Sequence, residues 1–133
     1  MSIGIIPVFQ PKFDDIRCAT TGEGLLAELE ILEDLADECT LPRLSSFADN
    51  REVPEDFDGD PEELAERLGP FDEWFPCEEG LECVSSLLAQ IEGNAEYAAE
   101  FEMADEIATE LRELKRVLKL AAARQGRFRF EIA

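Results

Sequence analysis

One short stretch decides the fold class: RFRFEI, at residues 127–132. Charged and apolar residues alternate along it without a break, and this period of two is typical of a strand with one buried face. Phe128, Phe130 and Ile132 are therefore predicted to point toward the core. A second stretch, IGIIPVF at residues 3–9, predicts another strand, weakened by Pro7 because proline cannot donate a ladder hydrogen bond.

The residues between these strands show helical periodicity. Apolar residues spaced three and four apart predict an amphipathic helix over 23–38, entered at 21–24 with a threonine as its cap. Asp60, followed by Pro61 and two glutamates, predicts the start of a short helix that ends at Leu68.

Two further helices are predicted toward the C-terminal end. The first covers residues 78–92, with leucine, valine and isoleucine on one side. The second covers about 95–124, with a break near 102–103 and with Gly126 as the left-handed residue just past its end.

Together these elements predict a single α+β domain over residues 1–133, mainly helical, with a small sheet formed by the N- and C-terminal strands. A chain of 133 residues with 45% hydrophobic residues has enough apolar material for one core. Two strands alone are marginally stable, so we expect them to pair with each other and to pack on the helices. The only candidate for a third strand is the segment 41–47.

The chain carries a formal charge of −20, and this charge is unevenly placed. Residues 49–66 contain nine acidic residues and one arginine, whereas residues 112–133 carry a net charge of +5. The basic end either neutralises acidic helices within the fold or forms a DNA-binding face. Nucleic-acid phosphates and anionic lipids are poor partners for so acidic a molecule, so no nucleic acid and no membrane partner is predicted.

The composition also restricts the chemistry. No histidine is present, which removes the most common general base and the most common metal ligand. The four cysteines form no Cys-x-x-Cys pair, so they are predicted to be reduced, buried or half-buried thiols. No signal peptide or membrane-spanning apolar run is evident, which predicts a cytoplasmic protein. We predict no catalytic residue, no metal ligand and no cofactor.

One acidic motif begins like a calcium-binding loop: Asp56-x-Asp58-x-Asp60. The sixth position of such a loop needs glycine and the twelfth needs glutamate, but Pro61 and Arg67 stand there. We therefore predict a solvated acidic loop that ends in a helix cap.

The only tryptophan, Trp74, lies in an aromatic turn with Phe71 and Phe75. Such a cluster is either a core plug that closes one end of a helix pair or a partly exposed anchor for a partner. The second interpretation follows from the enrichment of tryptophan in binding hot spots.

Several short motifs carry a resemblance. LSSF at 44–47, DPEEL at 60–64, WF at 74–75 and EGL at 79–81, with Val84 after them, resemble the pattern of a group of small acidic bacterial cytosolic proteins. The resemblance covers about residues 25–132, and it implies packing and capping devices rather than an activity. In size and acidity alone the chain is also similar to bacterial immunity proteins, which neutralise toxins.

These observations predict a non-enzymatic acidic module that binds a basic protein partner, one specific form being an inhibitor or immunity-type protein. The predicted partner-binding residues are Asp49, Glu52, Glu55, Asp56, Phe57, Asp58, Asp60 and Trp74. Two alternatives stay open. One is a magnesium-dependent phosphohydrolase that uses helical carboxylates within 30–38 and 105–110. The other is a structural homodimer in which the terminal strands pair across chains, so the protein is expected to be a monomer or a homodimer.

Overall fold

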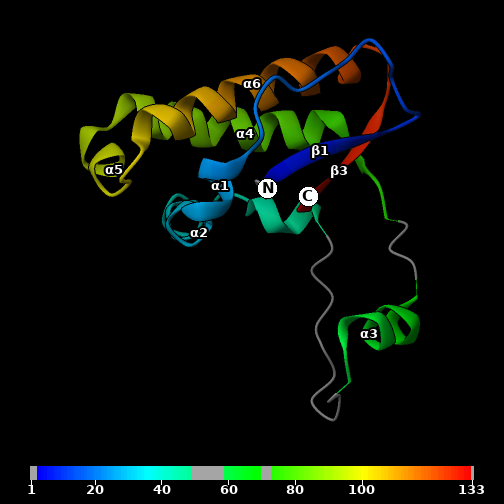
Figure 1. Ribbon diagram of the computed structural model, residues 1–133. Helices are drawn as coiled ribbons and strands as arrows, with labels where there is room; N and C mark the ends of the chain where they lie inside the picture. Colours follow the sequence, from blue (N-terminus) through cyan, green and yellow to red (C-terminus); the bar gives the residue numbers. More distant parts are fainter. Residues whose placement is uncertain (1–2, 49–58, 70–72, 133) are drawn as a thin grey trace.

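The computed structural model describes residues 3–48, 59–69 and 73–132. It confirms the predicted α+β class, with helices packed on a small antiparallel sheet whose two longer strands come from opposite ends of the chain (Figure 1). The elements in chain order are β1 (Ile5–Gln10), α1 (Glu23–Ala27), α2 (Leu29–Glu38), the 3-10 helix η1 (Leu44–Phe47), α3 (Pro61–Leu68), β2 (Phe75–Pro76), α4 (Cys77–Gly93), α5 (Ala95–Ala99), α6 (Ala104–Ala122) and β3 (Arg127–Ile132).

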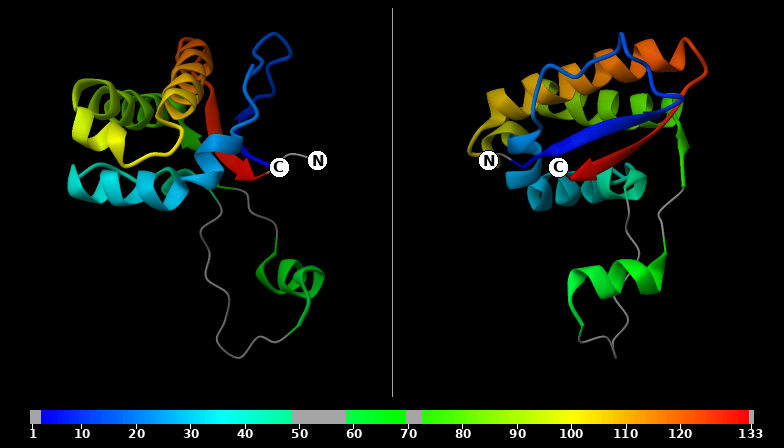
Figure 2. Two further views of the ribbon diagram at one scale, coloured as in Figure 1. Left: turned by 60° about the vertical axis from the view of Figure 1, so that its left-hand side comes forward. Right: turned by 45° about the vertical axis from the view of Figure 1, so that its right-hand side comes forward.

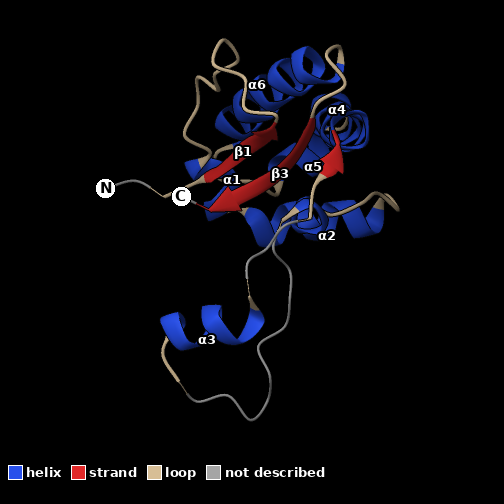
Figure 3. Cartoon of the chain, turned by 90° about the vertical axis from the view of Figure 1, so that its right-hand side faces the viewer, coloured by secondary structure: helices blue, strands red, loops and turns tan. Residues whose placement is uncertain are grey.

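The sheet is built around β3, in the order β1-β3-β2, and both neighbours run antiparallel to it (Figure 3). The register places Ile5 opposite Ile132 and Phe9 opposite Phe128. Phe128 and Phe130 are buried as predicted. Ile132 lies on the same side, beside Ile5 and Phe130, but it is not buried: it is 62% exposed because it is the last residue of its strand, at the rim of the sheet.

The segment 41–47, which was the predicted candidate for a third strand, does not form one. The third strand is the two-residue β2, within the aromatic turn, whereas 41–47 contains η1. Leu44 and Phe47 are both buried, and residues three apart lie on the same side of a 3-10 turn, whereas a strand would place them on opposite faces. Ala48, directly after η1, forms a single bridge with Phe130.

The outer edge of β1, away from β3, is partly occupied by a hydrogen bond to the chain before α1. The N–H of Ile5 donates to the carbonyl oxygen of Gly22 at 3.1 Å, so this residue turns its backbone groups away from β3. Because these groups alternate along a strand, Pro7 also faces the outer side and removes no bond to β3. The predicted weakening of this strand by Pro7 was therefore wrong.

The two terminal strands pair with each other within one chain.

The core lies between the sheet, the long antiparallel pair α4 and α6, and the helices α1 and α2 (Figure 2). Phe47 of η1 is at the centre of an aromatic cluster, with its ring centroid 5.3 Å from that of Phe128 and 5.4 Å from that of Phe75. The buried residues of the two helices are Cys77, Gly80, Cys83, Val84, Leu87, Leu88 and Ile91 in α4, and Ile107, Ala108, Glu110, Leu111, Leu114, Val117, Leu118 and Ala121 in α6. Apart from Glu110, these residues follow the helical spacing expected of a core face.

The helix predicted over 23–38 is two helices, with a bend at Glu28 (φ −114°, ψ 25°). The buried Glu28 carboxylate accepts hydrogen bonds from the N–H groups of Glu102, at 2.6 Å, and Met103, at 3.2 Å, just before α6 begins. It therefore serves the start of α6, whose first N–H groups have no partner within the helix.

A carboxylate of α6 in turn caps the start of α1. The buried Glu110 carboxylate accepts from the N–H groups of Gly24 and Leu25, both at 3.2 Å. The predicted threonine cap was wrong, because the residue before α1 is Gly22 in the left-handed conformation (φ 74°), with no side-chain cap. We call the Glu28 and Glu110 carboxylates the crossed caps.

The predicted break in the last helical region is confirmed, since α5 ends at Ala99 and α6 begins at Ala104. The end of α6 differs by one position from the prediction. Gln125, not Gly126, is left-handed (φ 59°), and the N–H of Gly126 donates to the Ala121 carbonyl oxygen at 2.9 Å. Gly126 is needed for close packing instead, because a Cβ there would lie 2.7 Å from the Phe13 ring.

Candidate functional site

Most of the predicted partner-binding residues lie outside the described part of the chain. Asp49, Glu52, Glu55, Asp56, Phe57 and Asp58 belong to this group. Asp60 and Trp74 are described, and the structure assigns each of them a contact within the protein.

Asp60 is the cap of α3, as predicted. Its Oδ1 accepts from the N–H of Glu63 at 2.9 Å, and its carbonyl oxygen accepts from the N–H of Leu64 at 3.1 Å. Pro61 follows at the first helical position, where a missing N–H costs no hydrogen bond. The helix lies apart from the sheet and the other helices in Figures 1 and 2.

Trp74 is half-buried on the outer face of the sheet. The register of β2 on β3 places it opposite Arg129, whose guanidinium carbon lies 4.4 Å from the indole ring centroid. A cation at this distance over an aromatic face is attracted by the ring. Trp74 therefore does not fill the core behind the sheet. Among the described contacts, none joins it to Asp60.

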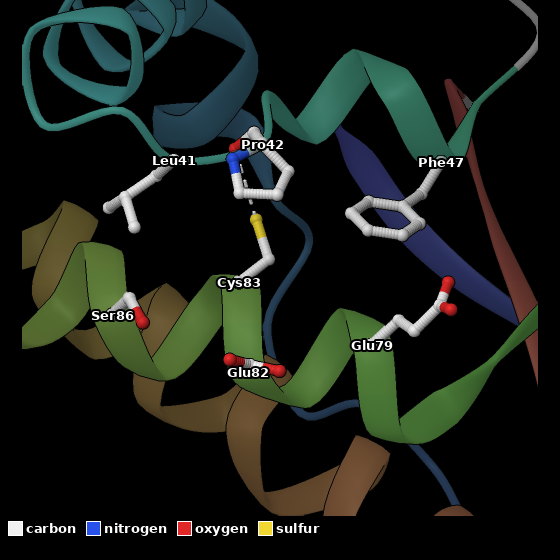
Figure 4. Close-up of a pocket in the computed structure, with 7 residues that line it drawn as sticks. All are labelled: Leu41, Pro42, Phe47, Glu79, Glu82, Cys83 and Ser86. Atoms are coloured by element: carbon white, nitrogen blue, oxygen red, sulfur yellow. Dashed lines mark hydrogen bonds between the residues drawn. The ribbon is translucent and has the colours of Figure 1, made fainter.

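A groove that the sequence did not predict lies between α4 and the connection that carries η1 (Figure 4). Its volume is about 240 Å³. The connection contributes Leu41, Pro42 and Phe47, and α4 contributes Glu79, Glu82, Cys83 and Ser86. We call this site the acidic groove.

The wall formed by Leu41 and Pro42 is fixed by the way α2 ends. The N–H of Leu41 donates to the Ala36 carbonyl oxygen at 2.7 Å, and the N–H of Thr40 donates to that of Asp37 at 3.2 Å. These two bonds form a Schellman motif, which reverses the chain after the helix and directs Leu41 back against it. The motif requires a left-handed residue, and Thr40 adopts φ 57°.

Thr40→Gly is expected to raise the free energy of unfolding by about 0.5–1 kcal/mol, because a β-branched residue is strained at positive φ and glycine is not. Urea denaturation measures the change. Thr109→Gly is the control, since Thr109 lies within α6, where glycine is expected to lower stability. Equal effects of the two substitutions would contradict strain at Thr40.

Cys83 links the two walls of the groove by a hydrogen bond. Its thiol donates to the Pro42 carbonyl oxygen at 3.3 Å, which Figure 4 shows as a dashed line. Burial raises the pKa of the Cys83 thiol to about 11, and that of Cys77 likewise to about 11. Both therefore stay protonated at neutral pH, and a protonated thiol is a poor nucleophile. All four cysteines are free and buried or half-buried, as predicted.

Two carboxylates form the rim of the groove on α4. Glu79 and Glu82 are exposed and lie one helical turn apart, and among the described residues neither forms an ion pair or a side-chain hydrogen bond. Like charges at this spacing repel each other. The rim is therefore a site of uncompensated negative charge beside an apolar surface.

The basic C-terminal region does not supply the missing partners. Arg112 pairs with Glu92 at 2.7 Å, Arg124 with Asp15 at 2.7 Å and Arg129 with Glu131 at 3.0 Å, while Arg116 pairs with Glu113. The hydrogen bonds from Arg124 hold the pKa of the Asp15 carboxyl below its usual value. These pairs support the interpretation that the basic end neutralises acids within the fold, and none of those acids is a predicted partner-binding residue.

Three of the helical carboxylates predicted as alternative magnesium ligands have other contacts. Glu33 and Asp37 of α2 face Arg43, and Glu110 of α6 is a crossed cap. Within residues 3–48, 59–69 and 73–132, no three acidic or thiol side chains come together in an arrangement that could hold a metal ion. The phosphohydrolase alternative stays a prediction.

No family model, curated protein or solved structure matches this chain. In the part of the chain that the structure describes, every helix is too short or too polar to cross a bilayer.

The sequence did contain a signal for the acidic groove. Residues 79, 82, 83 and 86 follow the spacing i, i+3, i+4 and i+7, which defines one continuous face of a helix. The more apolar face beside it, with Leu81, Val84, Leu87, Leu88 and Ile91, is the one that predicted the helix. The opposite wall had no such signal, because it depends on how α2 ends and on where η1 packs.

Proposed function

We propose that this protein is a non-enzymatic acidic module that binds a basic protein partner, inhibition of that partner being one specific form. The observation that carries the proposal is the charge of Glu79 and Glu82 beside an apolar groove, in a molecule of formal charge −20. Among the described residues these two carboxylates have no ion-pair partner, and Arg112, Arg116, Arg124 and Arg129 pair with other acids. Such a surface attracts a cationic partner over long range and fixes its orientation on contact.

The test is to capture the partner from cell extract at low salt, purify it, and measure the dissociation constant by calorimetry over a series of salt concentrations. We expect a basic partner whose affinity falls at least about tenfold between about 50 and 300 mM salt, because exposed charges are screened over that range. A neutral or acidic partner, or an affinity that does not change with salt, would contradict the proposal.

A further inference from the structure

We propose that the acidic groove binds an arginine side chain of the basic partner. This inference rests on the proposed function and adds the place and the chemistry of the contact. The apolar wall would cover the methylene groups of the arginine, and the rim carboxylates Glu79 and Glu82 would receive its guanidinium.

The size of the groove favours a side chain over a free ligand. Its volume of about 240 Å³ lies below the range of about 300–1,000 Å³ that is typical of small-molecule sites. It is partly open and lies between α4 and the connection that carries η1 (Figure 4). A side chain that projects from a protein surface can enter such a groove while its backbone stays outside.

The chemistry of the two walls suits arginine. Leu41, Pro42 and Phe47 offer apolar contact to a long aliphatic stem, which charged side chains bury readily while the charged end stays near water. A guanidinium is planar, weakly hydrated and able to donate several hydrogen bonds at once. Two carboxylates one turn apart therefore suit it better than they suit the compact, strongly hydrated ammonium of lysine.

The groove is formed before a partner arrives. Phe47 is only 6% exposed and is held by the aromatic cluster, while Pro42 is held by the Cys83 thiol. Walls that are already ordered lose little conformational entropy on binding. This rigidity reduces the cost of taking up a single side chain.

The arginine next to the groove wall in sequence does not fill the site. Arg43 follows Pro42 directly, but its Nε donates to Asp37 Oδ1 at 2.9 Å, and its guanidinium also lies within 3.9 Å of Glu33. Its side chain is thus directed to α2, and the rim carboxylates keep no arginine partner among the described residues. Since no described residue of the chain supplies this cation, charge complementarity favours one from the partner.

The probe is a short fluorescein-labelled peptide with two arginines around one leucine, and its binding is measured by fluorescence anisotropy. Matched peptides carry lysine or citrulline, the neutral isostere of arginine, at both positions. We expect the arginine peptide to bind at least about tenfold tighter than the citrulline peptide and severalfold tighter than the lysine peptide. Equal affinity of the arginine and lysine peptides would overturn the assignment to arginine, and so would the absence of binding.

The variant Glu79→Gln/Glu82→Gln tests the place of the contact. Its control, Glu78→Gln/Glu96→Gln, removes the same charge from exposed residues that do not line the groove. We expect the first variant to weaken binding of the arginine peptide at least about tenfold and the control by less than about twofold. Amide NMR shifts on adding the peptide should be largest at 41–47 and 79–86.

Equal loss in both double variants, or shifts centred on other residues, would overturn the groove as the site. The proposed function would still stand in that case if the purified partner binds with the expected salt dependence. A partner whose affinity ignores salt would reject the proposed function itself. The two failures are thus distinguished by different measurements.

Discussion

Replacing Glu110 by alanine is expected to lower the free energy of unfolding by about 3–5 kcal/mol, because two buried N–H groups, those of Gly24 and Leu25, lose their acceptor. An unpaired donor in a dry site costs about 1–3 kcal/mol, and the start of α1 also loses a negative charge that its dipole favours. Urea denaturation at neutral pH measures the change.

Glu106→Ala provides the control for Glu110. Glu106 is exposed on the same helix, one turn earlier, and accepts no hydrogen bond among the described contacts. Its removal is expected to change stability by no more than about 0.5 kcal/mol. If Glu110→Ala costs no more than Glu106→Ala, the capping role of Glu110 is refuted.

The pH dependence of stability gives a second readout of Glu110. Burial, opposed by the hydrogen bonds from Leu25 and Gly24, raises the pKa of this carboxyl above its ordinary value of 4.5. The folded state therefore binds more protons than the unfolded state above that pH, and the contribution of Glu110 to stability falls as the pH rises through the folded pKa. Acidification from neutral pH toward the ordinary pKa of 4.5 should stabilise the wild type more than Glu110→Gln, which cannot titrate.

Gly80→Ala is expected to destabilise the protein by about 3 kcal/mol, at the upper end of the usual cost of overpacking. An added Cβ would lie 2.2 Å from Cζ and 2.5 Å from Cε1 of Phe128. This ring cannot easily move, because it is fully buried in the central strand and packs against Phe47, Phe75 and Phe130. Thermal unfolding followed by circular dichroism measures the effect.

Gly93→Ala is the matched control for Gly80→Ala. Gly93 ends the same helix, and a Cβ there would meet nothing within 4 Å, so its stability is expected to be unchanged or slightly higher. Adding Phe128→Leu to Gly80→Ala should also cost less than adding it to the wild type, since the smaller side chain relieves the clash. A Gly80→Ala protein as stable as the Gly93→Ala protein would show that the ring yields.

The features that the sequence predicted correctly are those encoded by neighbouring residues. The alternation at 127–132 predicted β3 with its observed bounds, and Asp60-Pro61 predicted the start of α3. The bend at Glu28 could not be predicted in this way, because its carboxylate binds the chain just before α6, far away in sequence. The two-residue β2 is too short to show any period.

The same distinction holds for the candidate site. One wall of the acidic groove is a helix face, whose spacing is visible in the sequence, and the other wall exists only because a left-handed Thr40 turns the chain back toward α4. The predicted acidic residues of 49–58 lie outside the described residues, so their role stays a prediction. Trp74 was identified as either plug or anchor, but its contact with Arg129 required the strand register.

The pairing of Ile5 with Ile132 also bears on how the chain reaches its native state. The α4 and α6 pair joins segments that are near each other along the chain, whereas the sheet must bring together strands from its two extremes. The entropy lost on closing a loop grows with its length, so high contact order slows a folding reaction. We therefore expect α4 and α6 to pair first, and the terminal strands to pair late, in the rate-limiting stage of folding.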